Sequence, residues 1–322
     1  MKNPWDDIAL PSKDISARRV AHTHPLDLYW ARDYTGNYLF IYEFASTDTP
    51  LPTSLPDLSG IRGVFLKVAN NFDKNQFVLL LKDRSMWEIF LCLCNDLVQT
   101  TRQTQDSSSA IQALLQRLSH WQEFLKKIRP DILTEEAIMG LIGELLFIRN
   151  HLMPAFGAGQ AVRFWQGPEG LPQDFNVNNS AIEVKCQTGA TASTVRITSA
   201  QQLCPQLPEM YLFVVTLGKT TLDNKRAIKL PLLIAEIRDA LQSTNSSYID
   251  RFNDLLHEIG YVDSDRYLDF NYILSDQKIY QVTDGFPRIC PENIHTGIEH
   301  LSYSIKLSEC EPFRKCPDWM EV

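Results

Sequence analysis

Charged side chains at alternate positions of a predicted strand are the feature that most constrains the fold of this 322-residue chain. The turn-forming residues 178–180 (Asn-Asn-Ser) precede the run 182–187, Ile-Glu-Val-Lys-Cys-Gln, so the sequence predicts a β-hairpin whose first strand follows Asp174. Successive side chains of a strand point to opposite faces. One face of the second strand therefore carries Ile182, Val184 and Cys186, and the other carries Glu183, Lys185 and Gln187.

A second constraint is a glutamate inside an apolar helical segment. Glu144 lies in the stretch 140–148, on the same helical side as Leu141 and Phe147, so we expect it to be shielded from solvent. A buried carboxylate is costly unless it is paired or bound to a metal ion. Glu144 therefore either faces a functional site or bonds a neighbouring loop or an arginine such as Arg163.

Two carboxylates and a lysine that converge at a bend between strands are the groups that a metal-dependent phosphodiesterase needs. Hard oxygen ligands such as Asp174 and Glu183 bind Mg²⁺ and leave coordination positions for water and phosphate. The Lys185 ammonium can position the attacking water and offset charge that grows on the phosphate. Taken alone, Asp174 is typical of a turn, and Glu183 with Lys185 is typical of a surface ion pair. The combination favours a catalytic site.

Other polar and aromatic residues nearby are weaker candidates. Gln187 either holds a metal-bound water or the DNA backbone, or is a polar surface residue. Trp165 and the turn 167–168 are interpreted as packing, and Gln201 and Gln202 as weaker candidates for phosphate contacts.

Several short motifs between residues 134 and 217 resemble those of a known superfamily. They are Gly140–Leu145, Trp165–Pro168, Asp174-Phe175, Glu183–Lys185 and Gln202-Leu203. At these positions the chain resembles the PD-(D/E)XK nucleases, and more closely a bacterial family of PD-(D/E)XK members found near DNA-modification and phage-defence genes. Gln173 stands where the name-giving motif has proline, a position that shapes the bend and carries no ligand.

The resemblance implies a fold and an activity. The fold would be mixed α/β of the α+β kind, with a restriction-endonuclease-like α-β-β-β-α-β core. The activity would be Mg²⁺-dependent DNA cleavage, with Mn²⁺ as a substitute. Asp174 and Glu183 would be the principal metal ligands, Glu144 a supporting carboxylate, and Lys185 the residue that orients the water. The alternative is a noncatalytic DNA- or protein-binding subunit of a defence complex that keeps the nuclease fold.

The order of predicted elements suggests four segments. They are a β-rich domain at 1–105 that binds DNA or a partner, a connecting helix at 106–130, the nuclease core at 131–225 and an α+β extension at 226–322. Within the core we expect a helix at 134–152, strands at 161–165, 194–198 and 210–217, and a short helix at 199–203. Residues 87–98 fit either a helix or a strand.

The composition restricts which partners the chain can bind and in which compartment we expect it. A net charge of −8 argues against a nonspecific polyanion binder, so DNA binding would need a local basic groove, a homodimer or subunits of a defence complex. Seven cysteines without metal-ligand spacing predict a reducing, cytoplasmic compartment. The first residues lack the pattern of a signal peptide, and the apolar runs are too short to cross a bilayer, so we expect no membrane role.

Overall fold

The computed structural model describes most of the chain as two compact units. Unit 1 comprises residues 1–131 with 262–264, and unit 2 comprises residues 132–261 with 265–322. The residues described are 2–45, 55–58, 60–67, 74–104, 106–127, 132–189, 194–244 and 246–320. The architecture is mixed, with several sheets and helices, as expected for an α+β chain.

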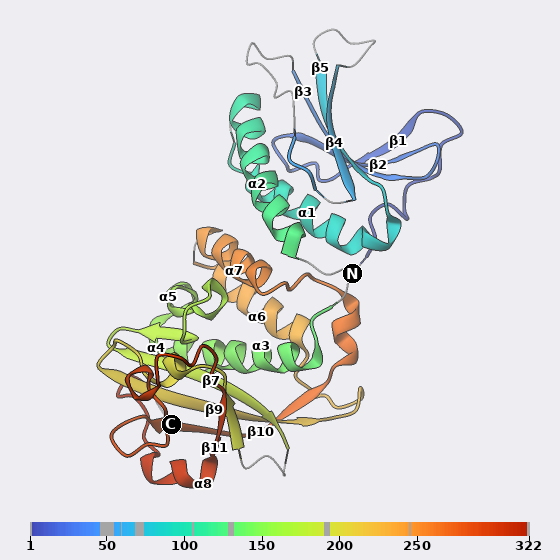
Figure 1. Cartoon of the computed structure of the whole chain (residues 1–322). Coiled ribbons are helices and arrows are strands. Elements are labelled where there is room, and N and C mark those ends of the chain that lie inside the picture. The colour runs from blue at the N-terminus through green and yellow to red at the C-terminus, as the bar shows by residue number, and fades with distance from the viewer. Residues whose placement is uncertain are drawn as a thin grey trace. The chain divides into compact units, whose positions relative to one another are not determined.

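Unit 1 is an antiparallel sheet covered on one face by two helices (Figure 1). Its five strands have the order β1-β2-β3-β5-β4, and α1 and α2 supply much of the larger apolar core. Residues 87–98, whose sequence fits either a helix or a strand, are helical. The elements are β1 (Ile15–Arg19), β2 (Asp27–Asp33), β3 (Tyr38–Ala45), β4 (Ile61–Lys67), β5 (Lys74–Leu81), α1 (Trp87–Thr100) and α2 (Ser107–Lys127).

Unit 2 is built around a four-stranded mixed sheet with the order β10-β9-β7-β6. The predicted hairpin is confirmed: β6 (Phe175–Val177) pairs antiparallel with β7 (Ser180–Thr188) across Asn178, whose φ is 52°. β7 is parallel to β9 (Glu209–Lys219), which pairs antiparallel with β10 (Tyr272–Gln281).

Helices cover one face of this sheet, and a smaller layer covers the other (Figure 1). α3 (Glu135–Phe147), which a π-helical turn at Ile148–Leu152 extends, packs with α6 (Leu230–Gln242) on the face that carries Val184. The opposite face carries Ala181 and meets the two-stranded sheet of β8 (Thr194–Ile197) and β11 (Tyr303–Lys306). The remaining helices of unit 2 are α4 (Met153–Phe156), α5 (Ala158–Phe164), α7 (Ser246–Glu258) and α8 (Leu307–Cys310).

One strand expected in unit 2 is wrong, and another is confirmed. Residues 161–165 are not a strand: they lie mostly in α5, which begins after Gly157, where φ is 80°. The apolar residues Ala161, Val162 and Trp165 have helical spacing, which a short run does not distinguish from a buried strand. The strand predicted at 194–198 is confirmed as β8, and it pairs with β11 in a separate two-stranded sheet.

The cysteines also differ from expectation. Cys204 and Cys290, 86 residues apart, form a disulfide with a Cα–Cα distance of 5.7 Å. Disulfides are uncommon in reducing compartments, so the cysteine pattern no longer supports a cytoplasmic location by itself. Within the described ranges, no helix has the length and apolar character needed to cross a membrane.

Gly143 is the close contact between α3 and the hairpin. A Cβ there would stand 3.3 Å from Cys186 Cβ and 3.4 Å from Val184 Cγ1, whereas nothing lies within 4 Å of the corresponding point at Gly140. We therefore expect Gly143→Leu to lower the free energy of unfolding by about 1–3 kcal/mol through overpacking. Gly140→Ala, the control in the same helix, should raise it by about 0.5–1 kcal/mol.

Urea denaturation of the three proteins checks this expectation. A Gly143→Leu protein as stable as the wild type would mean that α3 does not rest on β7 at this point.

Candidate active site

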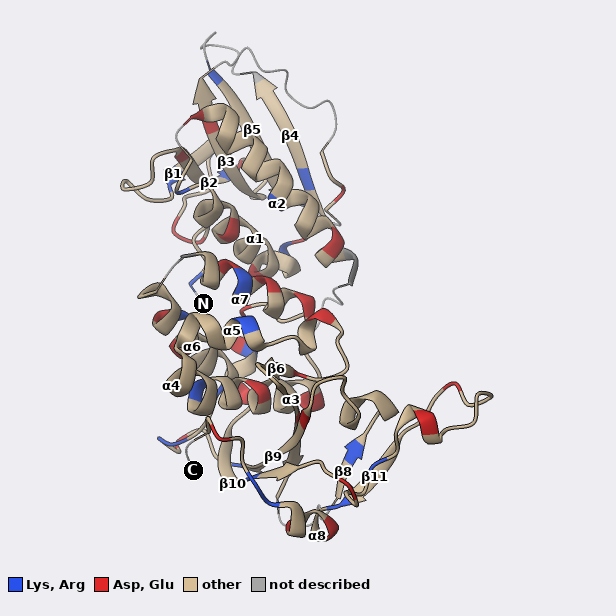
Figure 2. Ribbon diagram, turned by 90° about the vertical axis from the view of Figure 1, so that its left-hand side faces the viewer, with Lys and Arg blue, Asp and Glu red and all other residues tan. Residues whose placement is uncertain are grey.

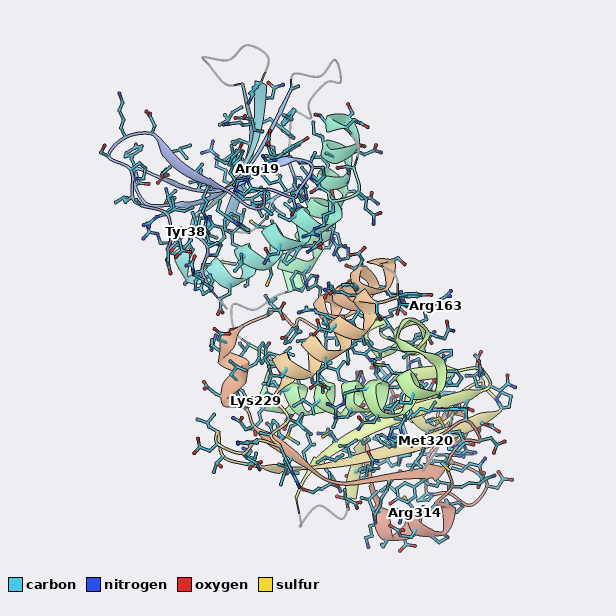
Figure 3. The ribbon with its side chains drawn as sticks, turned by 180° about the vertical axis from the view of Figure 1, so that it is seen from behind. Arg19, Tyr38, Arg163, Lys229, Arg314 and Met320 are labelled. Atoms are coloured by element: carbon cyan, nitrogen blue, oxygen red, sulfur yellow. A yellow bond between two sulfur atoms is a disulfide. The ribbon has the colours of Figure 1, made fainter. Side chains whose placement is uncertain are left out.

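Glu144 is held inside unit 2 by a tryptophan. Trp165, next to the C-terminal end of α5, donates a hydrogen bond from Nε1 to Glu144 Oε2 at 2.6 Å. Burial, and next the charge of Asp174, raise the pKa of the Glu144 carboxyl well above its usual range. Arg163, considered from the sequence as a partner, is instead exposed on α5 and labelled in Figure 3. The sequence indicated only a packing role for Trp165, and it did not predict that the indole N–H donates to Glu144.

Asp174 lies where the chain enters β6, and backbone bonds fix its position. Its carbonyl accepts hydrogen bonds from the N–H groups of Gln166 (2.8 Å) and Gly167 (3.0 Å). Its Oδ2 accepts the Val184 backbone N–H at 2.7 Å. Burial raises the pKa of Asp174 to about 6, although the Val184 hydrogen bond and the Lys185 charge both oppose this rise.

Glu183 and Lys185 form a buried ion pair on β7. Lys185 Nζ lies 2.7 Å from Glu183 Oε1, and the two side chains are 18% and 2% exposed. Among the residues that the structure describes, the other oxygen, Glu183 Oε2, is buried without a hydrogen-bond partner. Burial, followed by the Asp174 charge, raises the pKa of Glu183 well above its usual range. A surface ion pair, the simpler interpretation from the sequence, is therefore wrong.

The Lys185 ammonium has a second neighbour in the short 3₁₀ helix η4 (Ala200–Leu203). Nζ donates to Gln202 Oε1 at 3.4 Å, and the same oxygen accepts the Thr198 N–H at 2.8 Å. Gln173, which precedes Asp174, donates a hydrogen bond from Nε2 to the Gln201 carbonyl at 2.6 Å. Gln202 therefore contacts the lysine, and Gln173 ties η4 to the bend.

Gly167 leaves room for two of the carboxylates to approach each other. The point that its Cβ would occupy is 2.8 Å from Asp174 Oδ1 and 3.5 Å from Glu144 Oε2. A side chain there would collide with Asp174, so the Trp-x-Gly-Pro motif supplies both the Glu144 donor and the space beside it. The structure brings together Glu144, Asp174, Glu183 and Lys185. Gln187 instead bonds Thr216, with Nε2 3.1 Å from Oγ1.

The donor chemistry of this cluster fits a hard divalent cation. Glu144, Asp174 and Glu183 offer only carboxylate oxygens, and Glu183 Oε2 has no partner. In the side-chain conformations of the described residues, no group of three or more His, Cys, Asp or Glu side chains is arranged to hold a metal ion. Each carboxylate is instead engaged by a donor of the chain: Trp165, Val184 or Lys185.

Comparison with models of protein families shows the family to which the chain belongs. Residues 1–308 match the model of the family described as "Putative PD-(D/E)XK family member, (DUF4420)". The chain belongs to this family, as the resemblance of its motifs predicted. The match covers unit 1 as well as most of unit 2. No curated protein and no solved structure matches the chain.

The raised pKa of Asp174 predicts a pH dependence of stability in the metal-free protein. An acid whose folded pKa is raised stabilises the fold fully below its unfolded pKa of about 3.8, and this contribution is lost as pH rises through about 6. Relative to Asp174→Asn, which does not titrate, wild-type stability should fall by about 2–3 kcal/mol between about pH 4 and pH 7.

Urea denaturation of both proteins in the presence of a chelator measures this difference. A difference that stays constant over the pH range, or grows with pH, would contradict the burial of Asp174.

Proposed function

We propose that the chain is a Mg²⁺-dependent DNA endonuclease that hydrolyses phosphodiester bonds in restriction or phage defence. The observation that carries the proposal is the meeting of Glu144, Asp174 and Glu183 with Lys185 beside the β6–β7 hairpin. Membership of a PD-(D/E)XK family supports the nuclease class. Buried ionisable groups cost stability, and a scaffold that only bound DNA or protein would not need this set.

Asp174 and Glu183 would hold the Mg²⁺ ion, with Glu144 as a supporting ligand directly or through water, and Mn²⁺ could substitute. The bound ion would polarise the phosphate and lower the pKa of the attacking water. The Val184 N–H bonds Asp174 Oδ2, and the other oxygen of this carboxylate, Oδ1, lies beside Gly167 on the side of Glu144. Among the described residues, Glu183 Oε2 is a buried oxygen without a hydrogen-bond partner, and it is therefore available to a metal ion.

Lys185 is the residue we assign to the nucleophilic water. Its ammonium is held between Glu183 and Gln202, so it is oriented before substrate arrives. A preorganised ammonium donates a hydrogen bond to the water and stabilises negative charge that grows on the phosphate. Hydrolysis would then proceed in line, without a covalent enzyme intermediate.

The core would be of the restriction-endonuclease type. Along the chain, α3, β6, β7, β8, η4 and β9 give the order α-β-β-β-α-β once α4 and α5, which lie between α3 and β6, are set aside, and β8 lies in its own small sheet. In Figure 2, acidic and basic segments are interspersed along the elements of both units. With a net charge of −8, DNA binding would require a local basic groove or a contribution from a second chain.

One site per chain cuts one strand, so double-strand cleavage would require a homodimer or sequential nicking. Subunits of a defence complex are the other candidate partners. A DNA substrate would place the enzyme in the cytoplasm. In the alternative, a noncatalytic subunit, Lys185 would have no role in chemistry. A test of this lysine therefore separates the two functions.

Lys185→Ala should slow DNA cleavage about a hundredfold or more while Mg²⁺ and DNA still bind. The reason is that the substitution removes transition-state stabilisation and leaves all three carboxylates in place. The assay follows nicking of plasmid DNA, modified and unmodified, with Mg²⁺ or chelator and with or without the products of neighbouring genes.

Lys306→Ala, at an exposed lysine of β11, is the control for loss of one positive charge. Cleavage by Lys185→Ala at the wild-type rate would show that this cluster is not the catalytic centre. Wild-type protein that never cleaves in the presence of Mg²⁺ would favour the noncatalytic function.

A further inference from the structure

Trp165 joins two of the proposed metal ligands through different parts of the same residue. Its indole Nε1 donates to Glu144 Oε2 at 2.6 Å, and its backbone forms an isolated antiparallel β-bridge with Phe175, the residue after Asp174. Glu144 lies on α3, whereas Asp174 directly precedes β6. The relative position of these two carboxylates therefore depends on how firmly Trp165 is held.

The indole of Trp165 is fixed by its surroundings. The residue is 0% exposed, and its ring contacts that of Phe252 on α7, with the two centroids 5.9 Å apart. Its backbone N–H donates to the Val162 carbonyl of α5 at 3.2 Å. A side chain that packing locks in one rotamer holds its hydrogen-bond partner in one orientation. The Glu144 carboxylate is therefore oriented before any ion binds.

Unit 1 contains a second bond of the same kind in a different electrostatic setting. Trp121 Nε1 donates to Asp96 Oδ2 at 2.6 Å, and Trp121 is as fully buried as Trp165. Asp96 also forms an ion pair with Arg117, which balances its charge. Among the described residues Glu144 forms no ion pair, and its donor is the neutral indole. The bond at Glu144 thus orients a carboxylate and leaves its charge to be balanced by a cation.

We propose that Trp165 is a positioning residue that holds Glu144 in place for a divalent cation. The inference rests on the proposed function, because it concerns the same metal site. An indole N–H is a donor only, so Trp165 is not itself a ligand and acts through Glu144. Loss of a hydrogen-bond partner of a metal ligand typically lowers metal affinity about 10–100-fold.

Trp165→Phe keeps a buried aromatic ring and removes the donor. It should weaken Mn²⁺ binding to the full-length protein about tenfold or more, measured by electron paramagnetic resonance. Trp121→Phe is the matched control, because it removes the same kind of bond in unit 1 and should leave the Mn²⁺ affinity unchanged. Each substitution leaves a carboxylate without its indole donor, so both should lower the urea midpoint of unfolding. A purely structural role would change that midpoint and not the metal affinity.

A double-mutant cycle with Glu144→Gln tests whether Trp165 acts through this carboxylate. Glu144→Gln should weaken Mn²⁺ binding by itself, and adding Trp165→Phe should cause no further loss beyond about twofold. Two independent losses that multiply in the double variant would mean that Trp165 acts elsewhere, and would overturn the inference.

The indole N–H signals of the wild type give a second test, which does not require Trp165→Phe to fold. In protein labelled with ¹⁵N-tryptophan, the Trp165 signal is the one that Glu144→Gln displaces, and the Trp121 signal is the one that Trp121→Phe removes. Mg²⁺ should shift the Trp165 signal saturably and leave the Trp121 signal in place.

Three results would overturn the inference: wild-type Mn²⁺ affinity in folded Trp165→Phe, equal weakening by both tryptophan substitutions, or a Trp165 signal that Mg²⁺ does not shift. If the wild type binds Mn²⁺ and cleaves DNA in any of these cases, the proposed function stands and only the role of Trp165 fails. No saturable Mn²⁺ binding by the wild type would overturn the proposed metal site, and this inference with it.

Discussion

The hydrogen bond from the Val184 backbone N–H to Asp174 Oδ2 is the interaction on which the site depends. β6 pairs with β7 only as far as Ile182, so no ladder partner on that side engages Val184. The Asp174 carboxylate takes this place, which satisfies a buried N–H and also directs the carboxylate toward Glu183 and Lys185. The short first strand of the hairpin is therefore what creates the site.

Burying this cluster works against stability, and its neighbours offset only part of the cost. Burial is the largest cause of the raised pKa of Glu144, Asp174 and Glu183. Each carboxylate receives one strong donor, yet no described residue donates to Glu183 Oε2. The apolar core between the sheet and α3 supplies stabilisation that offsets the cost of burying these carboxylates. A divalent cation is the charge that would offset the remaining penalty.

The sequence predicted the parts of unit 2 that depend on local pattern. Period-two alternation identified the β7 face, and the turn at Asn178 identified the hairpin. Residues 161–165 were assigned to a strand because a short apolar run carries too little periodicity. The pairing of β8 with β11 and the Cys204–Cys290 disulfide join segments about 90–110 residues apart, and no local signal records such contacts. The Trp165 donor could have been inferred only by asking what satisfies a buried Glu144.

The central claim is that these carboxylates form a site for a divalent metal ion. Titration of Mn²⁺ into the protein at neutral pH, followed by electron paramagnetic resonance, measures this directly. The account predicts saturable binding that Asp174→Asn and Glu183→Gln each weaken about tenfold or more, while Glu309→Gln, at an exposed glutamate of α8, leaves it unchanged. No saturable binding by the wild type, or equal binding by all four proteins, would contradict it.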